Sequence, residues 1–162
     1  MTSTMSKIHT VRPIMPESFE QVKMLDRYSD NYVYIMLEDM DKEACESMAY
    51  AYGIFNNDTL VGYCTLGSGI GVLDDIRQAN ETVVLSDVYI LDSYRNCGLG
   101  SKLVKEAIEQ KLKNDPTIKN VFLTILDIDL KNFYEKLGFE SLTDDDYSML
   151  YVPCKNGTYM LY

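Results

Sequence analysis

The sequence predicts a single domain with a mixed α/β layer fold, in which helices flank a central sheet. Residues 82–91 form an apolar, β-branched run typical of a central strand, and residues 121–126 form a fully apolar run typical of a buried strand. Between these runs, apolar side chains recur every four residues from Leu99 onward, which predicts a helix over residues 99–113. The chain has 162 residues, 46% of them hydrophobic, and is therefore long enough for one substantial core.

Short elements bounded by turn residues are expected in the first half of the chain. They are a strand over residues 8–14, a helix over residues 18–25, and a hairpin of strands 50–55 and 60–66 across the turn 56–58. The region between the helix and the hairpin is ambiguous, because residues 32–35 could form a strand while 38–48 are typical of a helix. A glycine-rich loop at residues 67–71 leads on toward the central strand.

The second half continues beyond Asp115-Pro116, which ends the predicted helix. The elements expected after the buried strand are a helix around residues 129–137 and strands over 139–142 and 149–152, joined across an acidic turn at 144–146. We expect residues 1–7 to be disordered or extended and residues 153–162 to form a C-terminal extension of the one domain, 1–162.

Residues 95–100, with the sequence Arg-Asn-Cys-Gly-Leu-Gly, lie between the central strand and the helix. Glycines let the backbone bend and approach a ligand, and the first N–H groups of a helix point toward an anion with the positive end of the dipole behind them. The stretch therefore predicts a phosphate-binding turn. A nucleotide-binding P-loop is excluded because Ser101-Lys102 follows Gly100 in the wrong order. A dinucleotide fingerprint is excluded because the turn lies past the middle of the chain.

A second motif lies at residues 132–139, with the sequence Asn-Phe-Tyr-Glu-Lys-Leu-Gly-Phe. Lys136 falls in the last turn of a predicted helix, and Gly138 can adopt the left-handed conformation that closes it. Together the two stretches resemble the GCN5-related N-acetyltransferases (GNAT family), in which Arg-x-x-Gly-x-Gly is the pyrophosphate loop for acetyl-CoA. The resemblance implies a three-layer fold with a central mixed, mostly antiparallel sheet of six to seven strands and about four flanking helices.

The resemblance also implies where the cofactor lies. It assigns the pyrophosphate to the loop and the helix start, the pantetheine arm to the end of the central strand, and added positive charge to Arg95. The residues implied are Val88, Tyr89 and Ile90 on the strand and Asn96, Cys97, Gly98, Leu99, Gly100 and Ser101 in the loop and helix start. Cys97 would line the loop through its backbone, since no histidine lies near it in sequence to make it a nucleophile.

Two residues are candidates for the chemistry of acetyl transfer. By similarity, Tyr134 points its hydroxyl at the thioester sulfur and would protonate the departing thiolate, because a phenol stays protonated at neutral pH. The other interpretation of Tyr134 is a helix tyrosine packed on the core. Asp87, on the central strand, is the first candidate for the general base and Glu81 the second; either could instead be a surface carboxylate or bind the substrate's ammonium group.

One position departs from the family pattern. Seven residues before the tyrosine the family often has an asparagine that bonds the cofactor, and here Asp127 stands in that place. An ionised carboxylate accepts hydrogen bonds and cannot donate them, so Asp127 is kept as a cofactor-binding candidate that could instead face the substrate.

Composition limits the remaining function classes. The chain carries 15 basic and 25 acidic residues, and the stretch 95–136 is its net-positive part, with 8 basic and 6 acidic residues. This balance argues against nucleic-acid partners, and no apolar run reaches the length of a membrane span. Four scattered cysteines and one histidine favour a reducing cytoplasm and argue against a metal site or a disulfide scaffold.

The predicted function is acetyl-CoA-dependent transfer of an acetyl group to a primary amine of a small cationic molecule or peptide, by direct attack in a ternary complex. Tyrosines in the acidic first half could line a cleft for such a cation, namely those at positions 32, 34, 50 and 52. The alternatives are a protein N-terminal or lysine acetyltransferase and a non-catalytic acyl-CoA-binding module. The sequence leaves a homodimer open.

Overall fold

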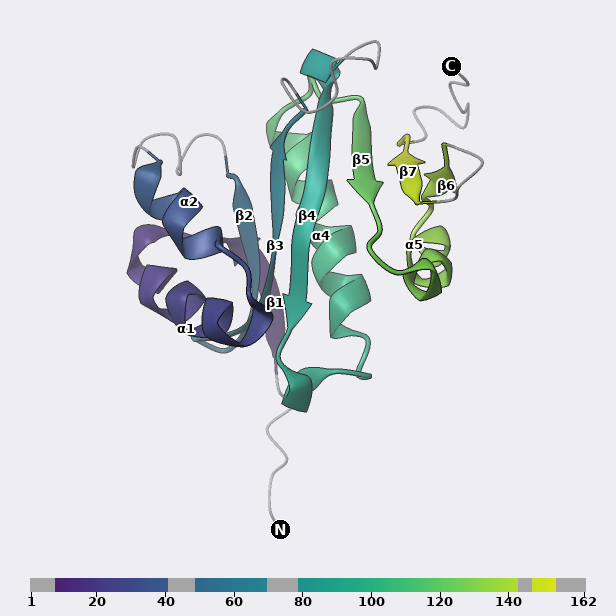
Figure 1. The fold of residues 1–162 in the computed structure, drawn as a ribbon. Helices are drawn as coiled ribbons and strands as arrows, with labels where there is room; N and C mark the ends of the chain where they lie inside the picture. The colour runs from purple at the N-terminus through teal and green to yellow at the C-terminus, as the bar shows by residue number, and fades with distance from the viewer. Residues whose placement is uncertain (1–7, 41–48, 70–78, 143–146, 154–162) are drawn as a thin grey trace. The chain divides into compact units, whose positions relative to one another are not determined.

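The computed structural model describes residues 8–40, 49–69, 79–142 and 147–153. Seven strands form a sheet in the order β1-β2-β3-β4-β5-β7-β6 (Figure 1). Their bounds are β1 (His9–Pro13), β2 (Ala51–Asn56), β3 (Thr59–Ser68), β4 (Thr82–Ile90), β5 (Asn120–Thr124), β6 (Glu140–Ser141) and β7 (Ser148–Tyr151). The described α-helices are α1 (Phe19–Ser29), α2 (Val33–Asp39), α4 (Leu99–Asn114) and α5 (Lys131–Lys136). Short 3-10 helices are η1 (Pro16–Ser18), η2 (Ala79–Glu81), η3 (Asp92–Tyr94) and η4 (Ile128–Leu130).

The chain divides into two compact units. The first contains the described residues up to Thr65 together with Asp87–Ala107, and the second contains those from Leu66 to Ser86 and from Ile108 onward. Both β3 and β4, and also α4, therefore contribute residues to each unit. The division of β4 falls between Ser86 and Asp87, so the candidate base begins the part of the strand that belongs to the first unit.

The first unit is built on an antiparallel meander of β1, β2 and β3. The hairpin turns at Asn57, whose φ of 56° lies in the left-handed region that asparagine tolerates. The helices α1 and α2 lie side by side and pack on one face of this meander (Figure 1). The buried residues that join helices and strands there are Ile14, Val22, Leu25, Val33, Leu37, Ala51, Phe55, Leu60 and Tyr63.

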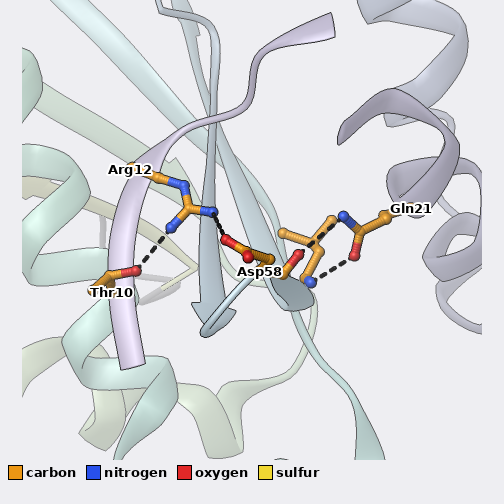
Figure 2. Close-up of polar contacts among 5 residues, drawn as sticks. Thr10, Arg12, Gln21 and Asp58 are labelled. Atoms are coloured by element: carbon orange, nitrogen blue, oxygen red, sulfur yellow. Dashed lines mark hydrogen bonds and ion pairs between the residues drawn. The ribbon is translucent and has the colours of Figure 1, made fainter. Parts of the chain in front are cut away.

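Figure 2 shows how polar side chains tie α1 to the hairpin of the first unit. Gln21 donates from Nε2 to the carbonyl oxygen of Asp58 at 3.2 Å and accepts at Oε1 from the N–H of Leu60 at 2.8 Å. Arg12 donates to the hydroxyl of Thr10 at 3.0 Å and lies 3.8 Å from the Asp58 carboxylate. The carboxylate and backbone of the turn are thereby held between β1 and α1, next to an open pocket of about 390 Å³.

The second unit makes the sheet a mixed one. In it β4 pairs in parallel with β5, Thr82 to Val84 facing Asn120 to Phe122, and β5 pairs antiparallel with β7. The outer strand β6 pairs antiparallel with β7. The predicted sheet, mostly antiparallel and with six to seven strands, is confirmed. None of the described helices is long and apolar enough to cross a lipid bilayer.

Most of the predicted elements are present, and two expectations are wrong. Residues 32–35 are not a strand: α2 begins at Val33, because its apolar residues Val33 and Leu37 recur at helical spacing and are buried on α1. The apolar run 121–126 is not wholly a buried strand, since β5 ends at Thr124 and Leu126 is 94% exposed. Of the helix expected over 38–48, the part at 41–48 lies outside the described residues. So do residues 1–7, the acidic turn 144–146, most of the glycine loop and nearly all of the C-terminal extension.

Candidate functional site

The strand β4 carries a bulge at Asp87, whose φ is 54°. Leu91 donates its N–H to the carbonyl of Val61 at 2.9 Å, and Gly69 donates to the carbonyl of Thr82 at 2.8 Å. Between these two hydrogen bonds the chain advances nine residues along β4, from Thr82 to Leu91, and only eight along the β3 side, from Val61 to Gly69. One extra residue on β4 is the definition of a bulge, and bulges redirect side chains next to functional sites.

The Asp87 carboxylate lies against a buried hydroxyl. Thr65, which is 1% exposed, donates from Oγ1 to Oδ2 of Asp87 at 3.0 Å. The pKa of the Tyr50 phenol is raised, mainly because the group is buried. Contact with the Thr65 side chain offsets part of this increase, and the negative charge of Asp87 adds to it. Burial, together with the Asp87 charge, also raises the pKa of the Cys64 thiol. Asp87 therefore interacts with Cys64 on β3 and with Tyr50 just before β2, and both groups stay protonated at neutral pH.

Beyond the bulge, β4 leads into a network around Arg95. Its Nε donates to the carbonyl of Ile90 at 2.8 Å, and its Nη1 lies 2.8 Å from the Asp92 carboxylate. The guanidinium also lies over the ring of Tyr89, 5.4 Å from the centroid. Arg95 is therefore engaged with the strand end and η3, and it holds the start of the glycine loop against β4.

The loop itself has the geometry of an anion cradle. Asn96 has a φ of 60° and Gly98 a φ of 78°, and residues 95–98 are exposed. A Cβ built on Gly98 would meet no described atom within 4 Å, so the backbone is open to a ligand on that side. The N–H of Lys102 donates to the Gly98 carbonyl at 3.2 Å, and the N–H groups before it in α4 are those that helix geometry leaves available. The loop residues therefore fit a pyrophosphate group.

Cys97 lies in this loop with its thiol exposed and free. Its Sγ donates to the carbonyl of Arg95 at 3.3 Å, a contact within the loop's own turn. The thiol contact therefore lies within the turn itself.

The second unit holds Tyr134 on α5. The side chain is 8% exposed, and its ring makes edge contacts with Phe133 at 4.9 Å and Phe139 at 5.7 Å. Its carbonyl accepts from the N–H groups of Leu137 and Phe139, at 3.0 and 3.1 Å. Gly138, with a φ of 100°, closes the helix in the way that the sequence predicts.

Asp127 is exposed and begins η4 in the second unit. Its Oδ1 accepts from the N–H of Asp129 at 3.0 Å, which makes it the N-cap of the short helix. Aspartate and asparagine are about equally good in this capping role. The departure from the family's asparagine therefore keeps the local backbone structure.

The site residues predicted from the sequence divide between the units. Asp87, the strand end and the whole loop with Ser101 belong to the first unit, and Tyr134 and Asp127 belong to the second. Among the tyrosines proposed for a cleft, Tyr52 is 0% exposed and belongs to the core, while Tyr32 is 72% exposed. In the parts of the chain that the structure describes, no group of three or more histidine, cysteine or acidic side chains could hold a metal ion.

Sequence reasoning missed two groups. Thr65 was not a candidate, since its position opposite Asp87 depends on the register of β3 and β4 and no local motif marks it. Tyr63 is fully buried and donates from its hydroxyl to Oδ1 of Asp26 at 2.6 Å, and its ring packs on Tyr89 at 6.0 Å. The same carboxylate accepts from the N–H of Tyr34 at 2.7 Å, so this contact fixes the corner between α1 and α2.

Comparison with known proteins gives a consistent result. A family model described as the acetyltransferase (GNAT) family matches residues 9–139. Two curated relatives are named thialysine N-epsilon-acetyltransferase: the protein of Bos taurus is 29% identical and that of Sus scrofa 31% identical, each over 85 residues. Each match covers 51% of this chain and 49% of the relative, so the chain spans about half the length of the curated relatives it matches.

Solved structures share the fold at low identity. Ard1 from Thermoplasma volcanium has a TM-score of 0.65 at 16% identity, over 91% of this chain and 99% of that one. The PaiA N-acetyltransferase of Thermoplasma acidophilum, solved with coenzyme A, has a TM-score of 0.60 at 20% identity, over 90% and 99%. Arabidopsis thaliana NAA60, solved with acetyl-CoA, has a TM-score of 0.61 at 14% identity, over 90% and 98%. These likenesses confirm the predicted fold.

Proposed function

The chain belongs to the acetyltransferase (GNAT) family, and from that premise we propose that it is an acetyl-CoA-dependent N-acetyltransferase. Its acceptor is a primary amine of a small cationic molecule or peptide, which attacks directly in a ternary complex. The observation that carries the proposal is the open cradle at Asn96 to Gly98, followed directly by α4. Such a turn binds the pyrophosphate of a nucleotide-containing cofactor through backbone N–H groups.

Each of the proposed site residues has a distinct task in the reaction. Acetyl-CoA supplies an activated acyl group as a thioester. The loop and the first turn of α4 bind the pyrophosphate, and the backbone of Val88 to Ile90 aligns the arm that carries the thioester. Asp87 accepts the proton that the ammonium group must lose before its nitrogen lone pair can attack. Tyr134 donates its phenolic proton to the departing sulfur, and Asp127 is the candidate contact to the cofactor that could instead face the substrate.

The charge of the chain supports a cationic acceptor. Outside residues 95–136 it carries 7 basic and 19 acidic residues, so most of the molecule attracts amines in their ammonium form. The curated relatives are named for an amine on a small amino-acid side chain, which favours a small molecule over a protein terminus. The exposed thiol of Cys97 and the buried thiol of Cys64, both free, support a reducing cytoplasm as the working compartment.

Calorimetry with acetyl-CoA, followed by a thiol-release assay over a panel of amines, tests this function. The panel runs from polyamines and amino acids to aminoglycosides and peptides. We expect binding of acetyl-CoA, and thiol release with at least one small cationic amine. Gly98→Glu should abolish binding because it brings a negative charge and a side chain into the cradle.

The matched control is Asn114→Glu, which adds the same charge at the exposed far end of α4 and should leave the affinity within twofold of wild type. Equal affinity in the Gly98→Glu and wild-type proteins would remove the loop from the cofactor site. Binding without thiol release for any amine would favour the acyl-CoA-binding module instead.

A further inference from the structure

Thr65 lies directly opposite the bulge of β4. Counted from the bond between Leu91 and Val61, Thr65 is four residues along β3 and Asp87 is four residues back along β4. The two residues therefore face each other in the antiparallel register that this bond sets, and the extra residue of the bulge follows on the far side. The hydrogen bond from Thr65 Oγ1 to Asp87 Oδ2, at 3.0 Å, closes this pair.

We propose that Thr65 is a positioning residue for the general base Asp87. The proposal deepens the proposed function, and it rests on Asp87 acting as the base. Thr65 does not touch the reacting atoms in this role. It acts by fixing the orientation of the carboxylate that does.

The local chemistry allows one direction of donation. An ionised carboxylate only accepts, so the single hydroxyl proton of Thr65 points at Asp87. Thr65 is therefore the donor of this bond and Asp87 Oδ2 the acceptor.

The position of Thr65 makes this contact a rigid one. The residue is 1% exposed within β3, and a β-branched side chain in a strand has few accessible rotamers. Asp87, in contrast, has a left-handed backbone, which is strained for a residue that is not glycine. A hydrogen bond to a charged group offsets such strain, so the pair also stabilises the bulge.

The consequence for catalysis concerns the two carboxylate oxygens. With Oδ2 held by Thr65, Oδ1 is the oxygen that accepts the ammonium proton, which leaves the lone pair on the amine nitrogen. Among the described residues, Tyr50 and Cys64 are titratable groups that interact with Asp87, and both remain neutral at pH 7 because their pKa values are raised.

Two variants separate positioning from packing. Thr65→Val removes the hydroxyl and keeps the side-chain shape, and Thr65→Ser keeps the hydroxyl. We expect Thr65→Val to lower kcat about tenfold and to leave KM for acetyl-CoA unchanged. Thr65→Ser should behave as wild type.

A readout independent of activity is the side-chain order of Asp87, measured by NMR scalar couplings in the whole protein. We expect one rotamer in wild type and Thr65→Ser, and averaging in Thr65→Val. Added to Asp87→Asn, Thr65→Val should cause no further loss of rate, because the two residues act as one unit. Should Thr65→Val fail to fold, Thr65→Ala compared with Thr65→Ser, which differs from it by the hydroxyl alone, gives the same test.

The proposal is overturned if Thr65→Val leaves both the Asp87 couplings and kcat as in wild type, or if Thr65→Ser fails to restore them. An additive loss of rate in the double variant would also contradict it. Absence of acetyl transfer by the wild-type protein would contradict the proposed function instead, and the couplings would still report whether Thr65 orders Asp87.

Discussion

The guanidinium of Arg95 donates from Nε to the carbonyl oxygen of Ile90 at 2.8 Å, joining the glycine loop to the last residue of β4. The contact uses a main-chain oxygen on the same strand end that is proposed to align the acyl arm. A second contact, from Nη1 to Asp92 at 2.8 Å, is a surface ion pair with both side chains about half exposed or more. The first contact is the one that sets the geometry of the loop, since exposed ion pairs contribute little.

Arg95→Lys distinguishes geometry from charge, because lysine keeps the charge and loses the planar fork that reaches Ile90. We expect Arg95→Lys to weaken acetyl-CoA binding about as much as Arg95→Ala, roughly tenfold, which corresponds to the loss of one charge-assisted hydrogen bond. Calorimetry measures both. The control, Asp92→Asn, breaks only the surface pair and should change the affinity less than threefold. Wild-type affinity in Arg95→Lys would show that charge alone matters.

Gly98→Ala tests the left-handed backbone of the cradle without adding charge. Alanine at a φ of 78° is strained, although no described atom lies within 4 Å of the added Cβ. We expect a loss of about 1 kcal/mol in the free energy of unfolding and weaker acetyl-CoA binding, measured by denaturant titration and calorimetry. Gly53→Ala is the matched control: its Cβ would lie 2.5 Å from Leu60 Cδ1 in the core, so stability should fall while affinity stays constant.

Tyr134→Phe removes the proposed acid and keeps the ring that packs on Phe133 and Phe139. We expect kcat to fall at least about a hundredfold, the usual size of a general-acid contribution, with acetyl-CoA affinity within twofold of wild type. Steady-state kinetics and calorimetry on the same preparation give both numbers. An unchanged kcat would assign Tyr134 to the aromatic core alone.

Tyr52→Phe concerns stability at alkaline pH. The Tyr52 hydroxyl is buried, has no hydrogen-bond partner among the described residues, and has a pKa raised to about 12 by burial and by Cys64. Because the folded pKa exceeds the unfolded value near 10, folding binds the proton more tightly, and stability is lost as the pH rises from about 10 to 12. Tyr52→Phe should therefore flatten this loss and raise the free energy of unfolding at pH 7 by about 1 kcal/mol.

The control for this change is Tyr28→Phe, at a side chain 71% exposed, which should leave the alkaline slope of wild type. Denaturant titrations at pH 7, 10 and 11.5 give the slope for each protein. A steeper slope in Tyr52→Phe than in wild type would contradict burial as the cause of the raised pKa.

The glycine loop, the helix after it and the closing turn at Gly138 could all be predicted from the sequence, because each depends on residues adjacent in the chain. Glycine permits a positive φ, a helix start exposes its N–H groups, and apolar spacing of four selects the buried face. The helical state of residues 33–39 could not be predicted. Its tyrosine and β-branched residues suit a strand, and its helix is stabilised by burial of Val33 and Leu37 against α1.

The phosphate-binding turn and the family motifs are thus properties of the local sequence, because neighbouring residues determine their backbone conformations. The surroundings of Asp87 depend instead on the register of two strands. The register of β3 and β4 places the carboxylate opposite Thr65, which lies 22 positions away in the chain. Strand register is set by the packing of whole side-chain faces and by nonlocal hydrogen bonds, and no short stretch of sequence contains that information.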